Sequence, residues 1–329
     1  MESTGVSAQQ PVRVALIGCG AWGRNLVRTH AALGSLVAVV DPDPAVAAAQ
    51  AETYGVEART FEEVLADPSV DAVVVAAPAA DHAALAEAAL AAGKHCYVEK
   101  PLALTVEDAE RVVAAAEGAG RVLMVGHLLQ YHPAFLRLRE LVDAGALGEL
   151  RYLYSNRLNL GRIRQEENSL WSFAPHDLSM LLSLVGEEPS EVTATGATFL
   201  NRGVADVTTT HLAFPSGPRA HVFVSWLHPF KEQRLVAIGT QGMLVFEDSA
   251  PQWEDKLKIY RHVIDTSGVA PVPKAAEAER ITVEKSEPLR NECQHFLDCV
   301  ANGATPRTDG VEGLAVLNVL RRAAACLSA

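Results

Sequence analysis

The sequence predicts an α/β protein whose first part is a doubly wound parallel sheet and whose second part is an α/β domain with an open, mostly antiparallel sheet. Three observations predict this fold class. An apolar strand near the N-terminus runs directly into a glycine-rich turn. Apolar strands then alternate with helices as far as residue 126. Beyond residue 131, strands of alternating polarity outnumber helices, which is typical of a sheet with one covered face.

The first elements form a βαβ unit. Residues 12–17 are an apolar strand, residues 18–23 match the pattern G-x-G-x-x-G, and residues 24–32 have the character of a helix. A second strand at residues 36–40 ends in Asp41, about 20 residues beyond the glycines. This combination predicts a dinucleotide-binding Rossmann domain.

Each glycine of the turn has a separate expected role. Gly18 permits the tight turn, Gly20 lets a pyrophosphate approach the backbone, and Gly23 lets the helix pack close to the strand. The helix N-terminus then offers free N–H groups and a positive dipole end to the phosphates. The alternative is a glycine-rich turn with a structural role alone.

Asp41 favours NAD over NADP as the cofactor. A carboxylate at the end of the second strand accepts hydrogen bonds from the ribose diol and repels a 2′-phosphate. The residues that follow it, at positions 42–44, include no Arg or Lys that could hold such a phosphate.

The remaining elements of the first part continue the alternation. The sequence predicts helices over 44–54, 60–65, 81–92 and 105–118, and strands over 70–76, 95–98 and 121–126. The tripeptide Glu99-Lys100-Pro101 follows one of these strands. Ligands of such sheets bind at the carboxyl ends of the strands, so Lys100 is a candidate site residue. An ammonium group there can hydrogen-bond a substrate hydroxyl, although a solvated loop lysine is the alternative.

The second part is built mainly of strands. We expect helices over 133–144, 175–184, 287–302 and 310–327, strands over 150–158, 191–199, 206–214, 219–226, 234–239 and 243–247, and a surface loop over 267–277. A free face of an antiparallel sheet commonly becomes a subunit interface, so we expect a homodimer or homotetramer formed through that face.

Length and these patterns suggest a domain organisation. With 329 residues the chain is long enough for two domains. We expect residues 1–10 to be a disordered tail, 11–127 the NAD-binding domain, and 128–329 the substrate-binding and oligomerisation domain.

Charge and composition exclude several classes of protein. The net charge of −12 argues against a nucleic-acid partner, since phosphate-rich polymers need a basic face. Five scattered cysteines without metal-ligand spacing predict reduced thiols and no metal site. Residues 1–10 lack the features of a signal peptide, and no apolar run is long enough to span a membrane. We therefore expect a cytoplasmic protein without a membrane partner.

Several short motifs together resemble the Gfo/Idh/MocA oxidoreductase family. They extend over almost the whole chain, and the Glu-Lys-Pro tripeptide is the most specific of them. The motifs are the 18–23 turn, Ala76-Ala-Pro78 with His82, Gly93-Lys94-His95, Glu99-Lys100-Pro101, Gly126-His127, Tyr131-His-Pro133, Leu147-Gly148-Glu149, Gly239-Thr-Gln-Gly242 and Thr308-Asp-Gly310. The resemblance implies a Rossmann domain followed by an open-sheet α/β domain, and the NAD(P)-dependent oxidation or reduction of a sugar or cyclitol carbinol.

The resemblance also implies catalytic residues. Family members place Asp-x-x-x-His on a helix, with the histidine as proton acceptor and the aspartate assisting it. His176 matches the histidine, but Ser172 stands where the aspartate is usual. Asp177, Glu166 or Glu167 could take over the role of that carboxylate. A helix-capping or core histidine is the alternative for His176.

On this reading the catalytic residues are Lys100 and His176. The residues expected at the cofactor are Gly18, Gly20, Ala21, Trp22, Gly23, Asp41, Ala77, Pro78, His82, Glu99, Lys100 and His127. For Trp22 and His127, packing alone is an equally good interpretation.

The segment 155–168 is rich in arginine and side-chain amides. In an acidic protein such a cluster is where phosphates or carboxylates bind, whereas a solvated, ion-paired loop is the alternative. The residues expected at the substrate are Lys100, Arg157, Asn159, Arg162, Arg164, Asn168, Trp171, Ser172 and His176.

The run Asn-Arg-Leu-Asn-Leu-Gly at residues 156–161, followed by Leu-Trp-Ser-Phe-Ala-Pro-His-Asp at residues 170–177, is similar to a subgroup acting on UDP-N-acetylglucosamine or its uronate, which are oxidised at C3 to the keto sugar. The expected partner is therefore a nucleotide sugar. The alternatives are a reductase of a nucleotide-linked keto sugar in deoxysugar or antibiotic biosynthesis, an inositol or free-sugar dehydrogenase, a relative that cleaves glycosidic bonds through transient oxidation, and a non-enzymatic dinucleotide-sensing regulator.

Overall fold

The structure of the chain is a computed structural model that describes residues 11–327 apart from residues 162, 166 and 202. Contacts divide the chain into two units. The first contains the residues up to Gly126 together with Leu289–Leu314, and the second contains His127–Pro288 together with the residues from Ala315 onward.

The first unit is a doubly wound α/β domain. Its described residues form a six-stranded parallel sheet in the order β3-β2-β1-β4-β5-β6, the strand order of dinucleotide-binding domains. The central strands β1 and β4 are buried along their whole length, which explains their unbroken apolar sequences. The strands are β1 (Val14–Ile17), β2 (Leu36–Val40), β3 (Glu57–Ala58), β4 (Ala72–Val75), β5 (His95–Glu99) and β6 (Leu123–Gly126).

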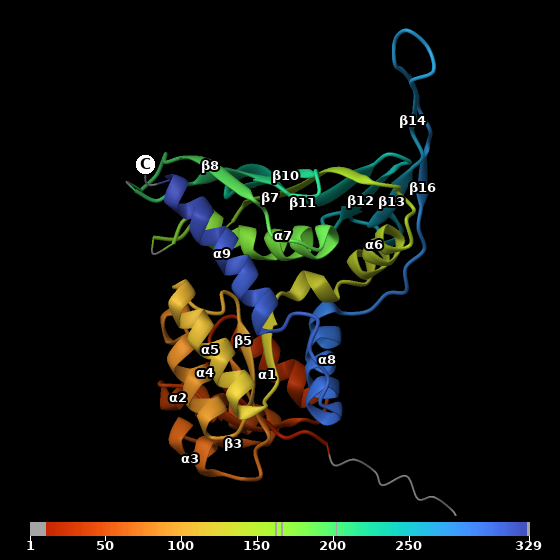
Figure 1. Cartoon of the computed structure of the whole chain (residues 1–329). Coiled ribbons are helices and arrows are strands. Elements are labelled where there is room, and N and C mark those ends of the chain that lie inside the picture. The colour runs from red at the N-terminus through yellow and green to blue at the C-terminus, as the bar shows by residue number, and fades with distance from the viewer. Residues whose placement is uncertain (1–10, 162, 166, 202, 328–329) are drawn as a thin grey trace, which may run out of the picture. The chain divides into compact units, whose positions relative to one another are not determined.

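Helices flank this sheet (Figure 1). Side chains cap the N-termini of three of them. Asp43 caps α2, Thr60 forms a capping box with Glu63 at α3, and Thr105 caps α5. The helices are α1 (Gly23–Ala32), α2 (Pro44–Tyr54), α3 (Phe61–Ala66), α4 (His82–Ala91), α5 (Val106–Ala119) and α8 (Pro288–Asn302).

The first unit also includes a segment that the sequence analysis assigned to the second domain. The ring of Phe296 on α8 packs edge-on against Tyr97 of β5, with 5.8 Å between ring centroids. The backbone N–H of Val125 donates to the carbonyl oxygen of Thr308 at 2.7 Å, and the Thr308 hydroxyl donates to the carbonyl oxygen of Val125 at the same distance. The returning chain is thus hydrogen-bonded to strand β6.

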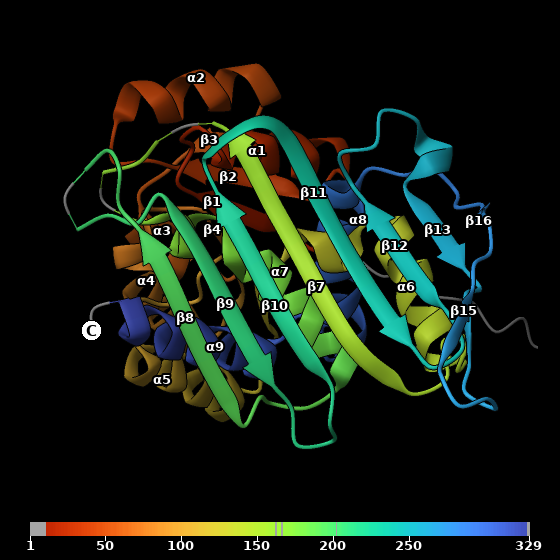
Figure 2. The same ribbon diagram turned by 90° about the horizontal axis from the view of Figure 1, so that it is seen from above.

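The second unit contains an eight-stranded sheet within its described residues, in the order β16-β13-β12-β11-β7-β10-β9-β8 (Figure 2). Neighbouring strands pair antiparallel, except that β7 and β10 run parallel. The strands are β7 (Leu150–Leu160), β8 (Glu191–Ala197), β9 (Val207–Ala213), β10 (Arg219–Ser225), β11 (Leu227–Gly239), β12 (Met243–Glu247), β13 (Leu257–Tyr260) and β16 (Ala278–Arg280).

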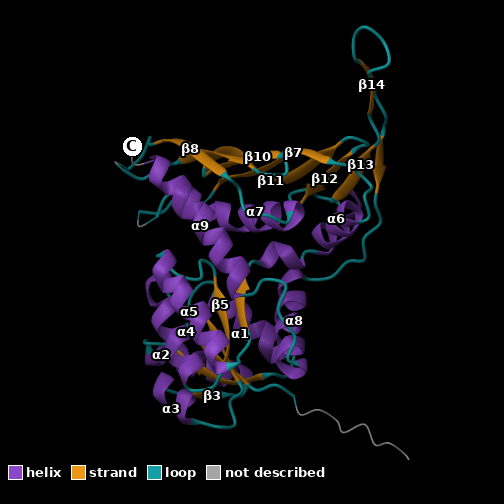
Figure 3. Ribbon diagram, viewed as in Figure 1, coloured by secondary structure: helices purple, strands orange, loops and turns teal. Residues whose placement is uncertain are grey.

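Helices cover one face of this sheet (Figure 3). They are α6 (Pro133–Asp143), α7 (Ser169–Val185) and the second-unit part of α9 (Gly310–Leu327). The covered face is apolar and buried, with Leu153, Ala237 and Leu244 fully shielded from solvent. No helix of the described chain lies over the opposite face in Figure 2. The predicted fold class, with its open and mostly antiparallel second sheet, is confirmed.

Three predicted element boundaries are wrong. The helix expected to begin at Pro175 begins at Ser169, because Asn168 caps it and Pro175 lies inside it. The strand expected from Arg234 begins at Leu227. Part of the loop expected over 267–277 is strand β15 (Val272–Lys274), which pairs with β14 (Val263–Asp265) in a hairpin.

No helix within the described residues is both long and apolar enough to cross a membrane.

Candidate functional site

The glycine-rich turn of the first unit has the geometry that a dinucleotide requires. Gly18 has a φ of +93°, and a Cβ atom there would lie 2.8 Å from the backbone of Ala76. A Cβ atom at Gly23 would lie 1.9 Å from the carbonyl oxygen of Gly18, so helix α1 packs too tightly for a side chain at this position. A Cβ atom at Gly20 would meet no atom of the described chain within 4 Å, so the backbone of Gly20 is open to a ligand.

Asp41 is fixed above this turn by two backbone N–H groups. The N–H of Cys19 donates to Oδ2 at 2.7 Å, and the N–H of Asp43 donates to Oδ1 at 3.0 Å. The carboxylate is therefore oriented before any ribose arrives, while each of its oxygens retains lone-pair capacity for a further donor.

A cavity of about 1010 Å³ lies at the carboxyl ends of the strands beside Asp41. Four other predicted cofactor residues line it, namely Gly18, Gly20, Ala77 and Pro78. Its size and its position at the edge where such sheets bind ligands fit a dinucleotide.

Arg59 also lines this cavity, and the sequence analysis missed it. Its guanidinium forms ion pairs with Glu57 at 2.5 Å and with Asp67 at 2.6 Å. These two carboxylates hold the pKa of Arg59 above its usual value. The arginine is therefore already neutralised by side chains of its own unit. Because Arg59 lies about 20 residues beyond Asp41 in the sequence, no local motif indicates it.

Glu99 and Lys100 lie where strand β5 ends. Glu99 is buried, and it accepts a hydrogen bond from the indole N–H of Trp22 at 2.5 Å and one from the backbone N–H of Lys100 at 3.2 Å. Trp22 is thus bound to the end of β5, and Ala21 precedes it in the exposed turn before α1. The Lys100–Pro101 peptide bond is cis.

His82 connects two loops of the first unit. Its ring is buried, with Nδ1 2.7 Å from the carbonyl oxygen of Pro101 and Nε2 2.9 Å from that of Ala77. This histidine holds the turn after Lys100 against the loop that lines the cavity. Its effect on a cofactor is consequently indirect, through those two backbone segments.

His176 lies on helix α7 of the second unit. The ring of His127 approaches it edge-on, with 6.3 Å between the centroids and 81° between the ring planes. The structure therefore pairs the predicted catalytic histidine with a residue that the sequence analysis assigned to the cofactor. Pro175 directly precedes His176 and has no N–H for the helix ladder, so the backbone hydrogen bonding of α7 is interrupted beside the candidate catalytic side chain.

Three further predicted substrate residues begin the same helix. Asn168 caps α7 by accepting a hydrogen bond from the backbone N–H of Trp171 at 3.2 Å. Ser172, which stands where relatives have aspartate, is buried. Trp171 is half-buried. Asn168 therefore has a structural role in the helix, whatever it contributes to a ligand.

Arg157 is engaged inside the second unit. Its Nε lies 2.6 Å from Oδ2 of Asp177, with side chains 10% and 1% exposed, and Ser155 donates to the same carboxylate at 2.5 Å. Asp177 consequently serves as the counter-ion of Arg157. We expected Arg157 to bind the anionic part of the substrate, but in the structure Asp177 already pairs with its guanidinium. The sequence alone does not indicate this contact.

The other substrate candidates lie nearer the surface. Arg164 is 43% exposed and pairs with Glu167 at 2.9 Å, and Asn159 is half-buried on β7. Arg162 lies outside the described residues, as does Glu166.

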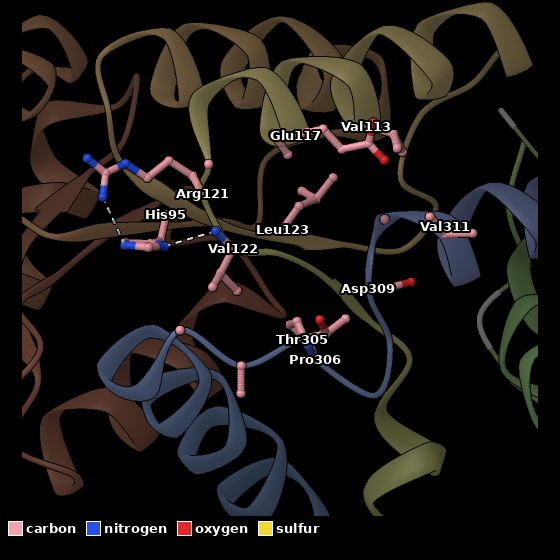
Figure 4. A pocket seen from close by; sticks show the side chains of 15 residues that line it. His95, Val113, Glu117, Arg121, Val122, Leu123, Thr305, Pro306, Asp309 and Val311 are labelled. Carbon is pink, nitrogen blue, oxygen red and sulfur yellow. Dashed lines mark hydrogen bonds between the residues drawn. The ribbon is translucent and has the colours of Figure 1, made fainter.

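A second cavity of the first unit, of about 410 Å³, contains none of the predicted site residues. It lies at the amino ends of β5 and β6, and Figure 4 shows Arg121 directed toward His95 on its wall. Nε2 of His95 is 3.4 Å from Arg121, and Nδ1 accepts from the backbone N–H of Val122 at 2.9 Å. Burial, and then the Arg121 charge, lower the pKa of His95.

Comparison with known proteins identifies relatives of both units. Residues 12–127 match the model of an oxidoreductase family with an NAD-binding Rossmann fold, GFO_IDH_MocA, and residues 135–245 match the GFO/IDH/MocA C-terminal domain. UDP-N-acetylglucosamine 3-dehydrogenase of Acidithiobacillus ferrooxidans is 30% identical over 93% of this chain and 94% of its own length. Inositol 2-dehydrogenase of Rhizobium meliloti is 29% identical over 93% of this chain and 94% of its own length.

Solved structures show the same likeness. The A. ferrooxidans UDP-N-acetylglucosamine 3-dehydrogenase superimposes with a TM-score of 0.84 at 29% identity, over 96% of this chain and 97% of that chain. GenD2 from gentamicin A biosynthesis, solved in complex with NAD, has a TM-score of 0.82 at 26% identity, over 100% of this chain and 97% of its own.

Proposed function

This chain belongs to the Gfo/Idh/MocA oxidoreductase family and is an NAD(P)-dependent sugar dehydrogenase, and we propose that it uses NAD to oxidise C3 of a UDP-linked sugar. UDP-N-acetylglucosamine or its uronate is the proposed substrate, and the corresponding 3-keto sugar is the product. The observation that supports this substrate best is the full-length similarity to a UDP-N-acetylglucosamine 3-dehydrogenase.

The choice of NAD is supported by the charges around the adenosine end of the cavity. Asp41 would accept hydrogen bonds from the ribose hydroxyls and repel a 2′-phosphate. Arg59, the cation of the cavity wall that could bind such a phosphate, is paired with Glu57 and Asp67. Binding NADP would therefore require breaking these ion pairs beside the Asp41 carboxylate.

The roles of the catalytic residues follow from the chemistry of alcohol oxidation. His176 accepts the hydroxyl proton, since a neutral imidazole is a suitable base near neutral pH. Lys100 donates a hydrogen bond to the same oxygen and stabilises the negative charge that develops on it. The bound nicotinamide supplies the acceptor for the hydride that leaves the carbon.

The anionic part of the substrate is assigned to the segment that precedes α7. Arg157 is committed to Asp177, so this assignment now depends on the exposed Arg164 and on Arg162. The exposed ion pair of Arg164 with Glu167 is weak in water, and a diphosphate can displace it.

We also place the protein in the cytoplasm as a homodimer or homotetramer. All five cysteines lie within the described residues and are free thiols, as is usual in a reducing compartment. The open face of the second sheet holds a cavity of about 420 Å³ with Tyr154, Ile238 and Val245 in its wall. A second copy covering these apolar side chains would remove them from water.

The experiment that tests this function follows nicotinamide absorbance after purified protein and NAD are mixed with separate candidate substrates. These are UDP-N-acetylglucosamine, its uronate, myo-inositol and free hexoses. NADH formed with a UDP sugar alone supports the proposal. Turnover with inositol, for which a 29% identical relative is named, would replace the substrate assignment. Absence of NADH with every compound would favour the alternative of a keto-sugar reductase.

A further inference from the structure

Beneath the end of strand β5 lies a buried carboxylic acid that has no cationic partner among the described residues. Glu292, on helix α8, is 0% exposed, and neither of its carboxyl oxygens has a hydrogen bond of good geometry within the described residues. Burial, and then the charge of Glu99, raise the pKa of Glu292 well above its usual value. An isolated buried carboxylate is very unfavourable, so the neutral acid is the form that this site stabilises.

Tyr97 lies between Glu292 and the cofactor side of the sheet. Its phenol is also 0% exposed, and it interacts with Glu292 on one side while donating to Oε1 of Glu99 at 3.3 Å on the other. Gly126 permits this arrangement, since a Cβ atom there would lie 2.8 Å from the Tyr97 hydroxyl oxygen and 2.9 Å from Oε2 of Glu99. The close approach therefore needs a glycine on the neighbouring strand.

The two carboxyl groups have very different surroundings. Glu99 receives hydrogen bonds from Tyr97, from the indole of Trp22 and from the backbone N–H of Lys100, and the charges of Lys100 and His82 also lower its pKa against the larger effect of burial. In the described part of the chain, the groups that affect the titration of Glu292 are Glu99 and the phenol of Tyr97. Cys293 adds a weaker interaction with Tyr97. A single proton shared by the pair thus belongs on Glu292.

From this arrangement we infer that Glu292 is a positioning residue for the cofactor. Glu292 acts as a neutral acid, and its effect passes through Tyr97 and Glu99 to Trp22 of the glycine-rich turn. Neutral Glu292 does not compete for the single Tyr97 proton, so the phenol donates to Glu99. Glu99 then holds the Trp22 indole, and with it the turn between β1 and α1. The inference does not depend on which sugar is oxidised, because its readouts are NADH binding and stability.

The first test concerns the protonation state. The folded pKa of Glu292 lies above the unfolded value of about 4.3, so its contribution to stability is fully present below that pH and declines as the pH rises toward the folded pKa. Glu292→Gln has no proton to lose. We expect its melting temperature, relative to the parent protein, to rise steadily between pH 5 and pH 8. A difference that stays constant with pH would overturn the inference. Glu110→Gln, an exposed change on α5, is the control and should give a constant difference.

The second test measures NADH affinity by fluorescence titration. Tyr97→Phe removes the donor to Glu99, and we expect it to weaken NADH binding by about threefold to tenfold, as for one lost hydrogen bond. Glu292→Gln, which cannot ionise, is the conservative variant and should bind NADH within about twofold of the parent protein, since a neutral amide, like the neutral acid, leaves the Tyr97 proton to Glu99. Parent-like affinity of Tyr97→Phe, or equal weakening by Glu292→Gln, would overturn the inference.

A double-mutant cycle separates a positioning role from general packing. If Tyr97 acts through Glu99 on the glycine-rich turn, its effect on NADH binding should fall below about twofold in a Trp22→Phe background. If the losses of NADH affinity in the Tyr97→Phe and Trp22→Phe variants add in full in the double variant, Tyr97 does not act on Trp22. That result would also overturn the inference.

Discussion

We expect Asp41 to determine the preference for NAD over NADP. We expect Asp41→Ser combined with Pro42→Arg to weaken NAD binding by about tenfold or more, since a hydrogen-bonded charge to the ribose is lost, and to strengthen NADP binding. Titration of the variant with NADH and with NADPH measures both effects. Pro42→Arg alone is the control, because it retains the carboxylate. An unchanged preference in the double variant would remove Asp41 from the cofactor site.

Lys100 and His176 are expected to act on the reacting hydroxyl. Lys100→Met and His176→Asn should each lower kcat by about a hundredfold or more while leaving NADH affinity within about threefold, because the lost interactions develop during the reaction. Steady-state kinetics with the identified sugar and NADH titration check the two halves of this expectation. Near-normal turnover in either variant would exclude that residue from the mechanism.

Two arginines of the same segment should respond to mutation in opposite ways. Arg157→Met leaves Asp177 buried without its counter-ion, which we expect to destabilise the fold by about 3 to 5 kcal/mol in urea unfolding. Arg164→Met removes only an exposed ion pair, so stability should hardly change, whereas KM for the UDP sugar should rise. A stable Arg157→Met protein with a raised KM would reverse these roles.

The residues that sequence reasoning found differ in kind from those it missed. Asp41, Lys100 and His176 belong to short motifs in which spacing along the chain predicts position. Arg59 at the cavity and Glu292 beneath β5 depend on contacts between distant segments, and neither lies in a recognisable pattern. In the sequence, the three arginines of segment 155–168 looked equally suited to bind an anion. In the structure, Arg157 is buried against Asp177, whereas Arg164 is exposed.

At the scale of the element, the turn between β1 and α1 offers a matched pair of substitutions. Gly20→Ala meets no atom of the described chain within 4 Å, so we expect normal stability and NADH binding at least about tenfold weaker, because the methyl group occupies the approach to the pyrophosphate. Gly23→Ala would place its Cβ 1.9 Å from the Gly18 oxygen and should lower stability as well.

The control for this pair is Gly118→Ala in helix α5. It also meets no atom within 4 Å, and it should stabilise the protein by about 0.8 to 1.0 kcal/mol through helix propensity alone. Thermal unfolding and NADH titration of the three variants give the comparison. Loss of stability in Gly20→Ala equal to that in Gly23→Ala would contradict the assigned roles.

Element boundaries were predictable where a local signal decides them. Thr105 was expected to begin a helix, and its side chain caps α5 by accepting from the N–H of Asp108. Pro175 was misleading, because proline is usual in a first helical turn, whereas the Asn168 cap lies about two turns earlier. The start of β11 was missed because residues 228–231 form an irregularity opposite β7 that no alternation of polarity reveals.

At the scale of the whole molecule, the open face of the second sheet should be covered by another copy of the chain. We expect Val245→Glu to lower the oligomeric state, measured by light scattering after gel filtration, because a carboxylate would replace an apolar side chain of the covered face and would lose its water there. Val311→Glu, at an exposed valine of the first unit, should leave it unchanged. A parent protein that is monomeric at micromolar concentration would contradict the proposed interface.

The two-part architecture was predictable because βαβ alternation and polarity alternation are both properties of the local sequence. The return of α8 to the first unit was not, since an amphipathic helix indicates only that one face is buried, not against which partner. The same limit applies to the substrate, because relatives of similar identity are named for a UDP sugar and for inositol.

The measurement that tests the central claim most directly uses UDP-N-acetylglucosamine carrying deuterium at C3, incubated with the protein and NAD. We expect deuterium to move from C3 to the nicotinamide ring, so that mass spectrometry finds singly deuterated NADH and a 3-keto sugar nucleotide. Unlabelled NADH would mean that another carbon is oxidised. No reduced cofactor with this compound or with its uronate would contradict the proposed substrate.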